Sequence, residues 1–309
     1  LAMSESLIEE NEIYSYHRHG FSTHGGSNNN VIRRNYANSR NYPDNSGAVS
    51  NDKSRGDSGF IFYTGSNNNN IVENNISEGN YSGFKLLARY GDHTGNKYYG
   101  DIDMGALGGL WPTDGGTFDR PPGALQTARD TYAENFVSID SVGHGLWSDG
   151  AINTRCTNCT VMGSALGNFH ADNGVNTNPA YSFYLDNILS IGSPGPGINI
   201  SSGMQLWTVT NSDSYKNTPN YSPAMSANYI AQKSVDPVLG TCKVWIPDSS
   251  PMKHAGKDLN GDGTKEDIGA NILYRYENGV LTTQPLWDPV TGEFPHGAIV
   301  AGVNDIAGS

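Results

Sequence analysis

Short apolar runs recur along this chain, and each is followed by an asparagine and then by another strand-like pair. The seven asparagines are Asn11, Asn35, Asn75, Asn135, Asn158, Asn187 and Asn211. Four of the six gaps between them fall between 23 and 29 residues, and the gaps of 40 and 60 indicate one coil plus an inserted loop. A period of about 20–30 residues with strand-like segments predicts a solenoid. Asparagine amides both donate and accept, so stacked copies are expected to bond along the coil axis.

A second landmark follows each asparagine, a Gly or Asn that precedes an apolar residue. Because side chains of a strand alternate faces, these apolar residues should stack inside: Phe21, Phe60, Phe84, Leu146, Phe169 and Ile198. The next residue of each copy should point outward: Ser22, Ile61, Lys85, Trp147, His170 and Asn199. A second outward row follows two residues later: His24, Tyr63, Leu87, Asp149, Asp172 and Ser201. A register shift of one residue would reverse every face.

The coils are predicted to span residues 1–234 and a C-terminal cap or extension residues 235–309. Two insertions interrupt the coils, at about 39–58 and 90–128, and both are rich in Gly, Asp, Asn or Pro. Loops of this length in a regular scaffold are functional or disordered. We expect both to flank the same outward face.

Composition excludes two classes of partner. The net charge is −12 and no stripe of Lys and Arg exists to neutralise phosphates, so nucleic acid is not expected as a partner. No apolar run approaches 18 residues, so no membrane-spanning helix is expected. Hydrophobic residues make up only 36% of the chain, and aromatic residues make up 10% of it. Disordered chains have few aromatic residues, whereas a solenoid with a narrow core and polar ladders fits both values.

The chain opens on Leu1-Ala-Met-Ser without a signal peptide, so we expect a mature form or fragment of a secreted protein that lacks its secretion signal and earlier coils. Its three cysteines are Cys156, Cys159 and Cys242, which leave at least one thiol unpaired. No second CxxC and no nearby His pair completes a zinc site. The sequence favours buried thiols, with a local disulfide as the alternative.

The segment from Asp258 to Asp267 predicts a structural calcium site. Oxygen-bearing side chains alternate along it, and a Gly occupies the sixth position, as in calcium loops. The predicted ligands are Asp258, Asn260, Asp262, Thr264, Glu266 and Asp267. Position twelve is Gly269, so the loop is not a standard EF-hand, and Glu266 or Asp267 would close the site. The alternative is an acidic surface turn.

Ser250-Pro-Met-Lys-His-Ala-Gly followed by Asp267-Ile-Gly-Ala resembles the ending of many bacterial right-handed parallel β-helix proteins. With the asparagine-centred coils, it makes residues 5–275 similar to the pectin-lyase-like superfamily. The resemblance implies an all-β, right-handed parallel β-helix with inserted loops and an irregular C-terminal extension. That superfamily includes lyases, hydrolases, epimerases, phage tailspikes and adhesins, so the fold does not select a reaction.

Asp149 and Asp172 occupy equivalent positions of neighbouring coils in this register, about 4.8 Å apart. Their repulsion is roughly 1 kcal/mol in water and roughly 3 kcal/mol at an effective dielectric constant of 20. This predicts a cation between them or a proton on one of them. Four basic side chains complete the predicted catalytic set: Lys85, Arg89, His144 and His170. The alternative is ordinary polar decoration of a solenoid face.

Trp147 and Tyr63 are predicted to stack on a sugar ring, and Asn199 and His24 complete the predicted substrate-binding set. The combination of acids, bases and aromatic residues favours a secreted, extracellular or cell-surface protein that cleaves an acidic polysaccharide by lyase or hydrolase chemistry. The rival interpretation is a non-catalytic structural, adhesive or glycan-binding solenoid.

Overall fold

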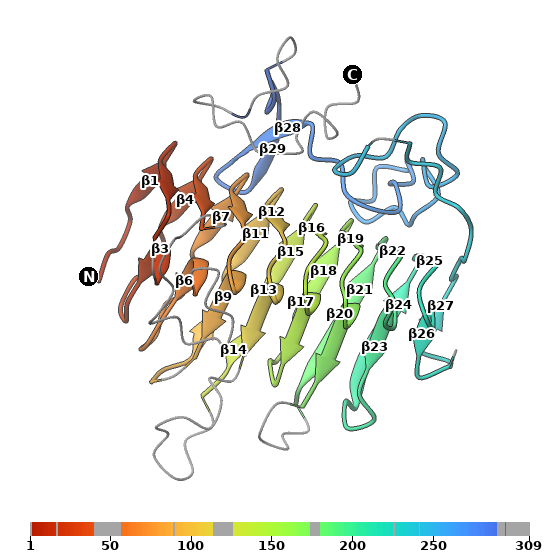
Figure 1. The fold of residues 1–309 in the computed structure, drawn as a ribbon, viewed down its shortest axis with the longest axis horizontal. Helices are drawn as coiled ribbons and strands as arrows, with labels where there is room; N and C mark the ends of the chain where they lie inside the picture. The colour runs from red at the N-terminus through yellow and green to blue at the C-terminus, as the bar shows by residue number, and fades with distance from the viewer. Residues whose placement is uncertain are drawn as a thin grey trace.

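The computed structural model describes the following residues: 2–16, 18–39, 57–88, 90–113, 126–173, 180–224, 226–240, 242–288 and 294. Within them the chain forms strands and turns and no helix. Eight successive coils stack along one axis in the described part, and each contributes one strand to each of three parallel sheets (Figure 1). The predicted all-β parallel β-helix is therefore confirmed.

The three sheets run along the length of the stack, and we number them in the order in which each coil visits them. Sheet 1 contains β1 (Leu7–Glu9), β4 (Val31–Arg33), β7 (Ile71–Glu73), β11 (Lys97–Tyr99), β15 (Tyr132–Glu134), β18 (Thr154–Thr157), β21 (Ser182–Asp186), β24 (Leu206–Thr210) and β27 (Tyr229–Ile230). Sheet 2 contains β2 (Glu12–Tyr14), β5 (Tyr36–Asn38), β8 (Ile76–Glu78), β12 (Ile102–Met104), β16 (Val137–Ile139), β19 (Thr160–Met162), β22 (Leu189–Ile191) and β25 (Asp213–Tyr215).

Sheet 3 has the longest strands and carries the predicted site. It contains β3 (His19–Thr23), β6 (Ser58–Phe62), β9 (Ser82–Leu87), β13 (Gly108–Thr113), β17 (His144–Asp149), β20 (Gly167–Asp172), β23 (Ile198–Ile200) and β26 (Tyr221–Ser222). Two small pairs complete the described strands: parallel β10 (His93–Thr94) with β14 (Ala128–Arg129), and antiparallel β28 (Tyr274–Glu277) with β29 (Val280–Pro285).

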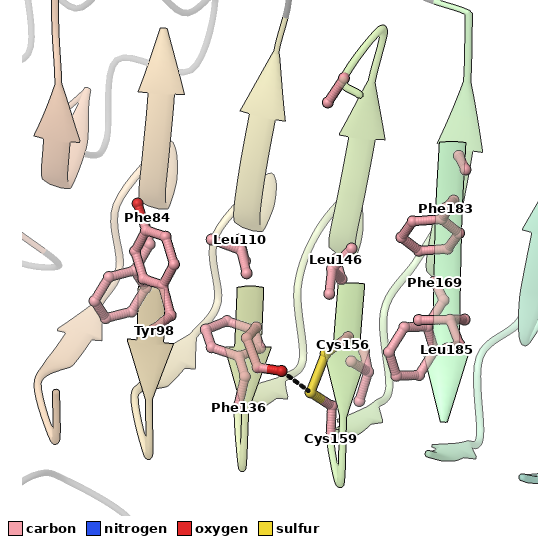
Figure 2. Close-up of a cluster of buried hydrophobic side chains, with 14 of the residues drawn as sticks. Phe84, Tyr98, Leu110, Phe136, Leu146, Cys156, Cys159, Phe169, Phe183 and Leu185 are labelled. Carbon is pink, nitrogen blue, oxygen red and sulfur yellow. Dashed lines mark hydrogen bonds between the residues drawn. A yellow bond between two sulfur atoms is a disulfide. The ribbon is translucent and has the colours of Figure 1, made fainter. Parts of the chain in front are cut away.

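The predicted inward column of sheet 3 is confirmed and gains one member. Its residues are Phe21, Phe60, Phe84, Leu110, Leu146, Phe169 and Ile198. The Phe60 and Phe84 rings stack in parallel with centroids 4.9 Å apart, and Figure 2 shows Phe84, Leu110, Leu146 and Phe169 along the core. Identical register in successive coils turns one repeated apolar residue into a continuous core.

A glycine precedes six of the seven inward residues, and Gly83 and Gly145 are required there by the close approach of sheets 2 and 3. A Cβ on Gly83 would collide with the Asp103 carboxylate, and one on Gly145 would collide with the Val161 side chain. A side chain at either of these glycines would therefore force the two sheets apart, whereas Asn168 at this position of the sixth coil donates to Ser190 of sheet 2 (2.9 Å).

The seven asparagines do not form a single ladder. Asn11, Asn35 and Asn75 point into the coil: the amide of Asn11 donates to Asn35 Oδ1 (3.0 Å), and that of Asn35 donates to Asn75 Oδ1 (3.0 Å). Asn75 donates in turn to Asp101 Oδ1 (2.9 Å). In the following coils this position is held by buried residues of other types: Phe136, Cys159, Ile188 and Ser212. The ladder therefore ends at Asp101.

The other four asparagines lie one residue earlier, at the turn between sheets 1 and 2. Asn135, Asn158, Asn187 and Asn211 have φ values of 52°, 51°, 54° and 46°. This is the left-handed region, which asparagine tolerates better than most residues. The recurring asparagine thus occupies either the inward ladder position or the αL position one residue before it. The assumption that all seven occupy equivalent positions was wrong.

Residues 97–113 form an ordinary fourth coil, although they fall within the predicted insertion at 90–128. The coil is hidden in the sequence because its ladder residue is Asp101 and its turn residue is Gly100, which has φ 63°. Counting asparagines therefore skips it. Residues 114–125 of this insertion and 40–56 of the other lie outside the described residues.

A second amide ladder precedes the strands of sheet 1 and was not predicted. Asn30 donates to Asn70 Oδ1 (2.8 Å), and Asn70 donates to Asn96 Oδ1 (2.9 Å). All three side chains are fully buried. The signal that would have revealed it is an asparagine directly before Val31, Ile71 and Lys97.

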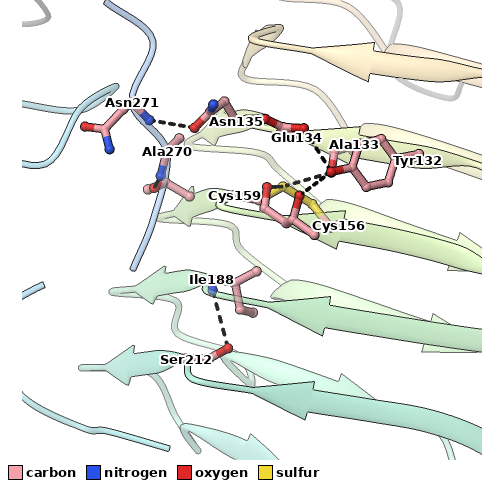
Figure 3. The surroundings of a disulfide bond; sticks show 12 residues. Tyr132, Ala133, Glu134, Asn135, Cys156, Cys159, Ile188, Ser212, Ala270 and Asn271 are labelled. Carbon is pink, nitrogen blue, oxygen red and sulfur yellow. Dashed lines mark hydrogen bonds between the residues drawn. A yellow bond between two sulfur atoms is a disulfide. The ribbon is translucent and has the colours of Figure 1, made fainter. Parts of the chain in front are cut away.

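Cys156 and Cys159 form a disulfide in the core, so the favoured interpretation of free buried thiols was wrong. Both residues are fully buried, among the apolar side chains shown in Figure 2. Cys159 occupies the inward ladder position, and its partner lies three residues earlier at the end of sheet 1 (Figure 3). Cys242 is the free cysteine among the described residues.

The C-terminal segment, residues 242–288, folds back over the outer face of sheet 2 as a strap (Figure 1). Ile272 and Trp287 of the strap join one apolar cluster with Ile102 and Val137 of the sheet. The middle strands of sheet 2 are therefore buried on both faces, and their outward residues Ile102, Met104, Val137 and Ile139 are apolar. Burial of each such side chain contributes roughly 1.5–3 kcal/mol.

The turn asparagines anchor this strap. Asn187 accepts from the Lys257 backbone N–H (2.7 Å) and donates to the Lys257 carbonyl (2.9 Å). Asn135 accepts from the backbone N–H of Asn271 (2.9 Å, Figure 3) and donates to the Tyr276 hydroxyl (2.7 Å). The αL turn directs these amides away from the core, toward the strap.

Asp101 is expected to be neutral in the folded protein. Its Oδ1 accepts two bonds from Asn75, while its Oδ2 is buried without a hydrogen-bond partner. Burial raises the pKa of Asp101 well above its ordinary value. A pKa that is raised in the folded state gives stability that is lost as pH rises, by about 1.4 kcal/mol per unit at most. Asp101→Asn should therefore raise the melting temperature more at pH 8 than at pH 5.

Asp248→Asn is the matched control, because that side chain is 99% exposed. Melting curves of both variants and the wild type at each pH test the prediction. Equal pH dependence in the wild type and D101N would contradict it.

Asn187→Gly should destabilise the protein by about 1–3 kcal/mol, since it removes both bonds to Lys257 but keeps a residue that tolerates the αL turn. Asn211→Gly is its control, at the equivalent turn of the next coil. Chemical denaturation should show a clearly smaller change for N211G. A similar change in both would mean that the turn, and not the strap contact, determines the effect.

Candidate functional site

The outer face of sheet 3 brings the predicted acids together with His144, His170 and Trp147, while Lys85 lies two coils before Asp149. The first outward row runs Ser22, Ile61, Lys85, Trp111, Trp147, His170, Asn199 and Ser222. The second includes Leu87, Thr113, Asp149 and Asp172. Asp149 and Asp172 are paired across neighbouring strands, so the predicted adjacency is confirmed.

Trp111 is the residue of this face that sequence reasoning missed, because it was assigned to a loop. Its ring stacks on Trp147 with centroids 4.4 Å apart and planes inclined by 8°. The ammonium group of Lys85 lies 3.9 Å from the centroid of the Trp111 ring. Lys85, Trp111 and Trp147 thus form one continuous column along the coil axis, stabilised by cation–π and stacking interactions.

Each indole also donates a hydrogen bond to the carboxylate of the next coil. Trp111 Nε1 donates to Asp149 Oδ2 (3.4 Å), and Trp147 Nε1 donates to Asp172 Oδ2 (3.2 Å). Thr113 donates to the same oxygen of Asp149 (3.1 Å). The tryptophan column therefore sets the orientation of both carboxylates.

Two histidines stack beside the carboxylates. The rings of His144 and His170 lie 4.3 Å apart with planes inclined by 17°. Nε2 of His170 is hydrogen-bonded to Asp172 Oδ2 (3.2 Å). Burial, with a smaller contribution from His170, lowers the pKa of His144 to about 4, so His144 is neutral at pH 7. This gives a neutral imidazole next to a histidine that a carboxylate orients.

Lys85 is a buried lysine whose ammonium group contacts an aromatic ring. Burial lowers the pKa of Lys85, while Asp57 and Asp149 oppose that shift. Its ammonium group lies over the Trp111 ring. Lys85 itself is two coils away from Asp149. Lys85 therefore lies at one end of the column and the carboxylate pair at the other.

The predicted substrate-binding residues divide between the two ends. Asn199 is paired with His170 in the next coil, near the acids. Tyr63 and His24 lie in the first two coils, with ring centroids 5.3 Å apart. One face of Trp147 is covered by Trp111, and the His170 ring of the next coil lies 6.2 Å from it, so sugar stacking on Trp147 stays a prediction. Arg89 lies outside the described residues.

The predicted calcium ligands are only partly gathered. Asp258, Asn260 and Asp262 accept backbone N–H groups within their own tight loop, which Thr264 closes. The other two predicted ligands bind elsewhere: Glu266 accepts from Asn158, and Asp267 pairs with Lys253 (3.0 Å). Among the described residues, no three His, Cys, Asp or Glu side chains are grouped to hold a metal. Calcium in this loop stays a prediction.

No protein-family model matches the sequence, and no curated protein matches it either. None of the described residues forms a helix long and apolar enough to cross a membrane. Function must therefore be inferred from the geometry of sheet 3.

The face offers general acid–base chemistry beside a rigid support. Two adjacent carboxylates, a carboxylate-bound histidine and a neutral histidine lie within two coils. Such groups transfer protons or attack an electrophilic carbon, provided that a substrate lies across the coils.

His144→Gln should reduce the loss of stability that occurs on acidification. The pKa of His144 is lowered in the folded state, so its contribution is present above pH 6.5 and is lost as pH falls toward 4. The expected gain at pH 4.5 relative to pH 7 is on the order of 1 kcal/mol, since the side chain is partly exposed. Denaturation at both pH values measures it.

His254→Gln is the control, because 65% of that side chain is exposed. A parallel pH response of H144Q and the wild type would show that the His144 ring is protonated without cost to the fold.

Proposed function

We propose that the protein is a secreted or cell-surface enzyme that binds a polysaccharide across sheet 3 and cleaves a glycosidic bond at Asp149 and Asp172. The observation that carries the proposal is the pairing of these carboxylates on neighbouring coils, each oriented by an indole N–H. The disulfide in the core supports an oxidising compartment. The parallel β-helix also supports placing the chain with the pectin-lyase-like superfamily.

The spacing of the pair favours hydrolysis with retention. Neighbouring strands are about 4.8 Å apart, close to the roughly 5–5.5 Å separation of carboxyl groups in retaining glycosidases. One carboxylate would attack the anomeric carbon while the other donates its proton to the departing oxygen. Water would then displace the bound carboxylate and return a proton to the second. Two adjacent carboxyl groups favour the required state, with a single proton between them.

β-Elimination is the competing reaction on the same face. It needs a base for the α-proton and a group that neutralises the substrate carboxylate. His170 carries the base function in this proposal and a cation neutralises the substrate carboxylate, so an acidic polysaccharide is then required. The products distinguish the two reactions, since elimination leaves unsaturated ends and hydrolysis leaves ordinary reducing ends.

The non-catalytic interpretation also has a specific observation in its favour. Trp111 is covered on one face by Lys85 and contacts Trp147 on the other, and both indole N–H groups are bonded within the protein. A rigid adhesive or glycan-binding surface would show the same satisfied interactions.

Asp149→Asn and Asp172→Asn should each reduce cleavage of a responsive polysaccharide at least about a hundredfold, because each removes one carboxylate of the pair. Pectate, alginate and glycosaminoglycans, with and without calcium, form the test panel. Reducing ends and unsaturated products are both measured, and the anomer first released reports retention.

Asp248→Asn serves as the control variant, because Asp248 is exposed and lies in the strap segment. New ends from none of the substrates would reject the enzyme proposal for that panel. Glycan binding that persists in D149N and D172N without any turnover by the wild type would favour the non-catalytic interpretation.

A further inference from the structure

The stack of coils ends in a partial coil that leaves a cavity at its C-terminal end. β27 begins a ninth coil on sheet 1, and Lys233 pairs with Asp213 on sheet 2. The described part of sheet 3 ends one coil earlier, at β26, at the far end of the stack in Figure 1. Tyr221 of β26 therefore has no inward counterpart in the ninth coil among the described residues. A cavity of about 490 Å³ lies at this position. Its lining residues are Asn220, Tyr221, Ala224, Gln232, Lys233 and Ser234.

Gln232 is the ladder residue of the ninth coil. It follows Ala231, whose φ of 54° is that of the turn between sheets 1 and 2. Its Nε2 donates to the carbonyls of Val209 (2.7 Å) and Ile230 (2.8 Å). The amide of Asn35 binds the equivalent pair of carbonyls in the second coil. The Gln232 side chain therefore points into the open end of the core and forms one wall of the cavity.

One acceptor atom of Gln232 has no partner within the protein. Its Oε1 is buried without a hydrogen bond, whereas Oδ1 of Asn35 and of Asn75 accepts from the coil before it. Ser212 holds the ladder position before Gln232, and its hydroxyl donates to Thr210 instead (2.9 Å). A buried acceptor without a donor is costly, so such groups are rare in folded proteins. A ligand that donates a hydrogen bond would supply the missing partner.

The neutral part of the lining suits a ligand with several hydroxyl groups. The amides of Asn220 and Gln232 and the hydroxyl of Ser234 can both donate and accept hydrogen bonds. The Tyr221 hydroxyl already donates to the Lys233 carbonyl (2.7 Å), so the Tyr221 ring provides an apolar wall. A purely apolar ligand would leave the amides unpaired, whereas hydroxyl groups satisfy donors and acceptors alike.

The charge of Lys233 is balanced by a neighbour of the protein itself. Lys233 is paired with Asp213 across neighbouring strands. Burial raises the pKa of Asp213 to about 6, and the charge of Lys233 opposes that shift. The cavity therefore does not require an anionic ligand to compensate its lysine.

We propose that this cavity binds an uncharged sugar, either a monosaccharide or the terminal unit of a longer glycan. Sugar hydroxyl groups would donate to Gln232 Oε1 and bond to Asn220 and Ser234, and the C–H groups of the sugar would pack on Tyr221. The volume lies within the roughly 300–1,000 Å³ of small-molecule sites. Asp172 belongs to the outer face of the sixth coil, so this interior site does not depend on the proposed function.

Ala224→Phe should abolish binding of the neutral sugar that the wild type binds, because the added ring fills the cavity from an exposed position. A ligand-observed NMR titration with glucose, galactose, mannose and glucuronate measures the affinities. Glucuronate is the anionic counterpart of glucose. Ala227→Phe is the matched control, since Ala227 is exposed shortly after Ala224 and does not line the cavity.

Ser234→Ala tests the hydrogen bonds of the site separately from its shape. It should weaken binding of the same sugar by roughly three- to tenfold, because one hydroxyl of the lining is removed. Thermal melting of each variant checks that it is folded. D149N and D172N should bind the sugar like the wild type.

Each result supports or overturns the site. Sugar binding that is kept in A227F, D149N and D172N but lost in A224F would support it. Equal affinity in A224F and the wild type, or no saturable binding of any neutral sugar, would overturn it. Tighter binding of glucuronate than of glucose, weakened by salt, would overturn the choice of an uncharged ligand. Binding lost in D172N but kept in A224F would place the sugar on sheet 3, which overturns this site and leaves the proposed function standing.

Discussion

Parallel register between successive coils is the constraint on which the rest of this structure depends. A residue in one coil lies over its counterpart in the next at the strand spacing of about 4.8 Å, so any repeated side chain becomes a column. Phe60 over Phe84 produces the apolar core, and Asn35 over Asn75 produces the amide ladder. Trp111 over Trp147 and Asp149 over Asp172 produce the candidate site in the same way.

The ends of these columns show how tightly the register is maintained. The amide ladder stops at Asp101, where Phe136 takes the next inward position and leaves a carboxyl oxygen without a partner. Beyond Asp101 other residues hold the ladder position, and three of the four turn asparagines bind the strap: Asn135, Asn158 and Asn187. Asparagine after a strand of sheet 1 therefore serves the interior at one position and the strap at the position before it, and the third coil has both, with Asn75 in the ladder and Asn74 accepting from Tyr276 of the strap.

The strap gives sheets 2 and 3 different outer surfaces. It covers sheet 2 with apolar side chains such as Ile272 and Trp287, and this leaves sheet 3 to carry the polar and aromatic columns. On sheet 3 the outward column changes along the axis, from Lys85 over Trp111 and Trp147 to His170, and Asp149 and Asp172 lie beside its later part. A scaffold of repeated coils thus presents a face with a direction, which suits recognition of a directional polymer better than recognition of a small ligand.

Local pattern alone determined the coil period, the alternation of inward and outward residues and the pairing of Asp149 with Asp172, because these follow from the strand period of two and from the repeat itself. Tertiary structure alone decided what depends on contacts between distant segments. Trp111 lies in the site because its strand pairs with that of Lys85, in a coil that the sequence pattern hides because Asp101 replaces a ladder asparagine. Cys156 and Cys159 pair because the coil turns between them. The strap gave the turn asparagines their partners, since Lys257 lies 70 residues from Asn187 and no local spacing signals that contact.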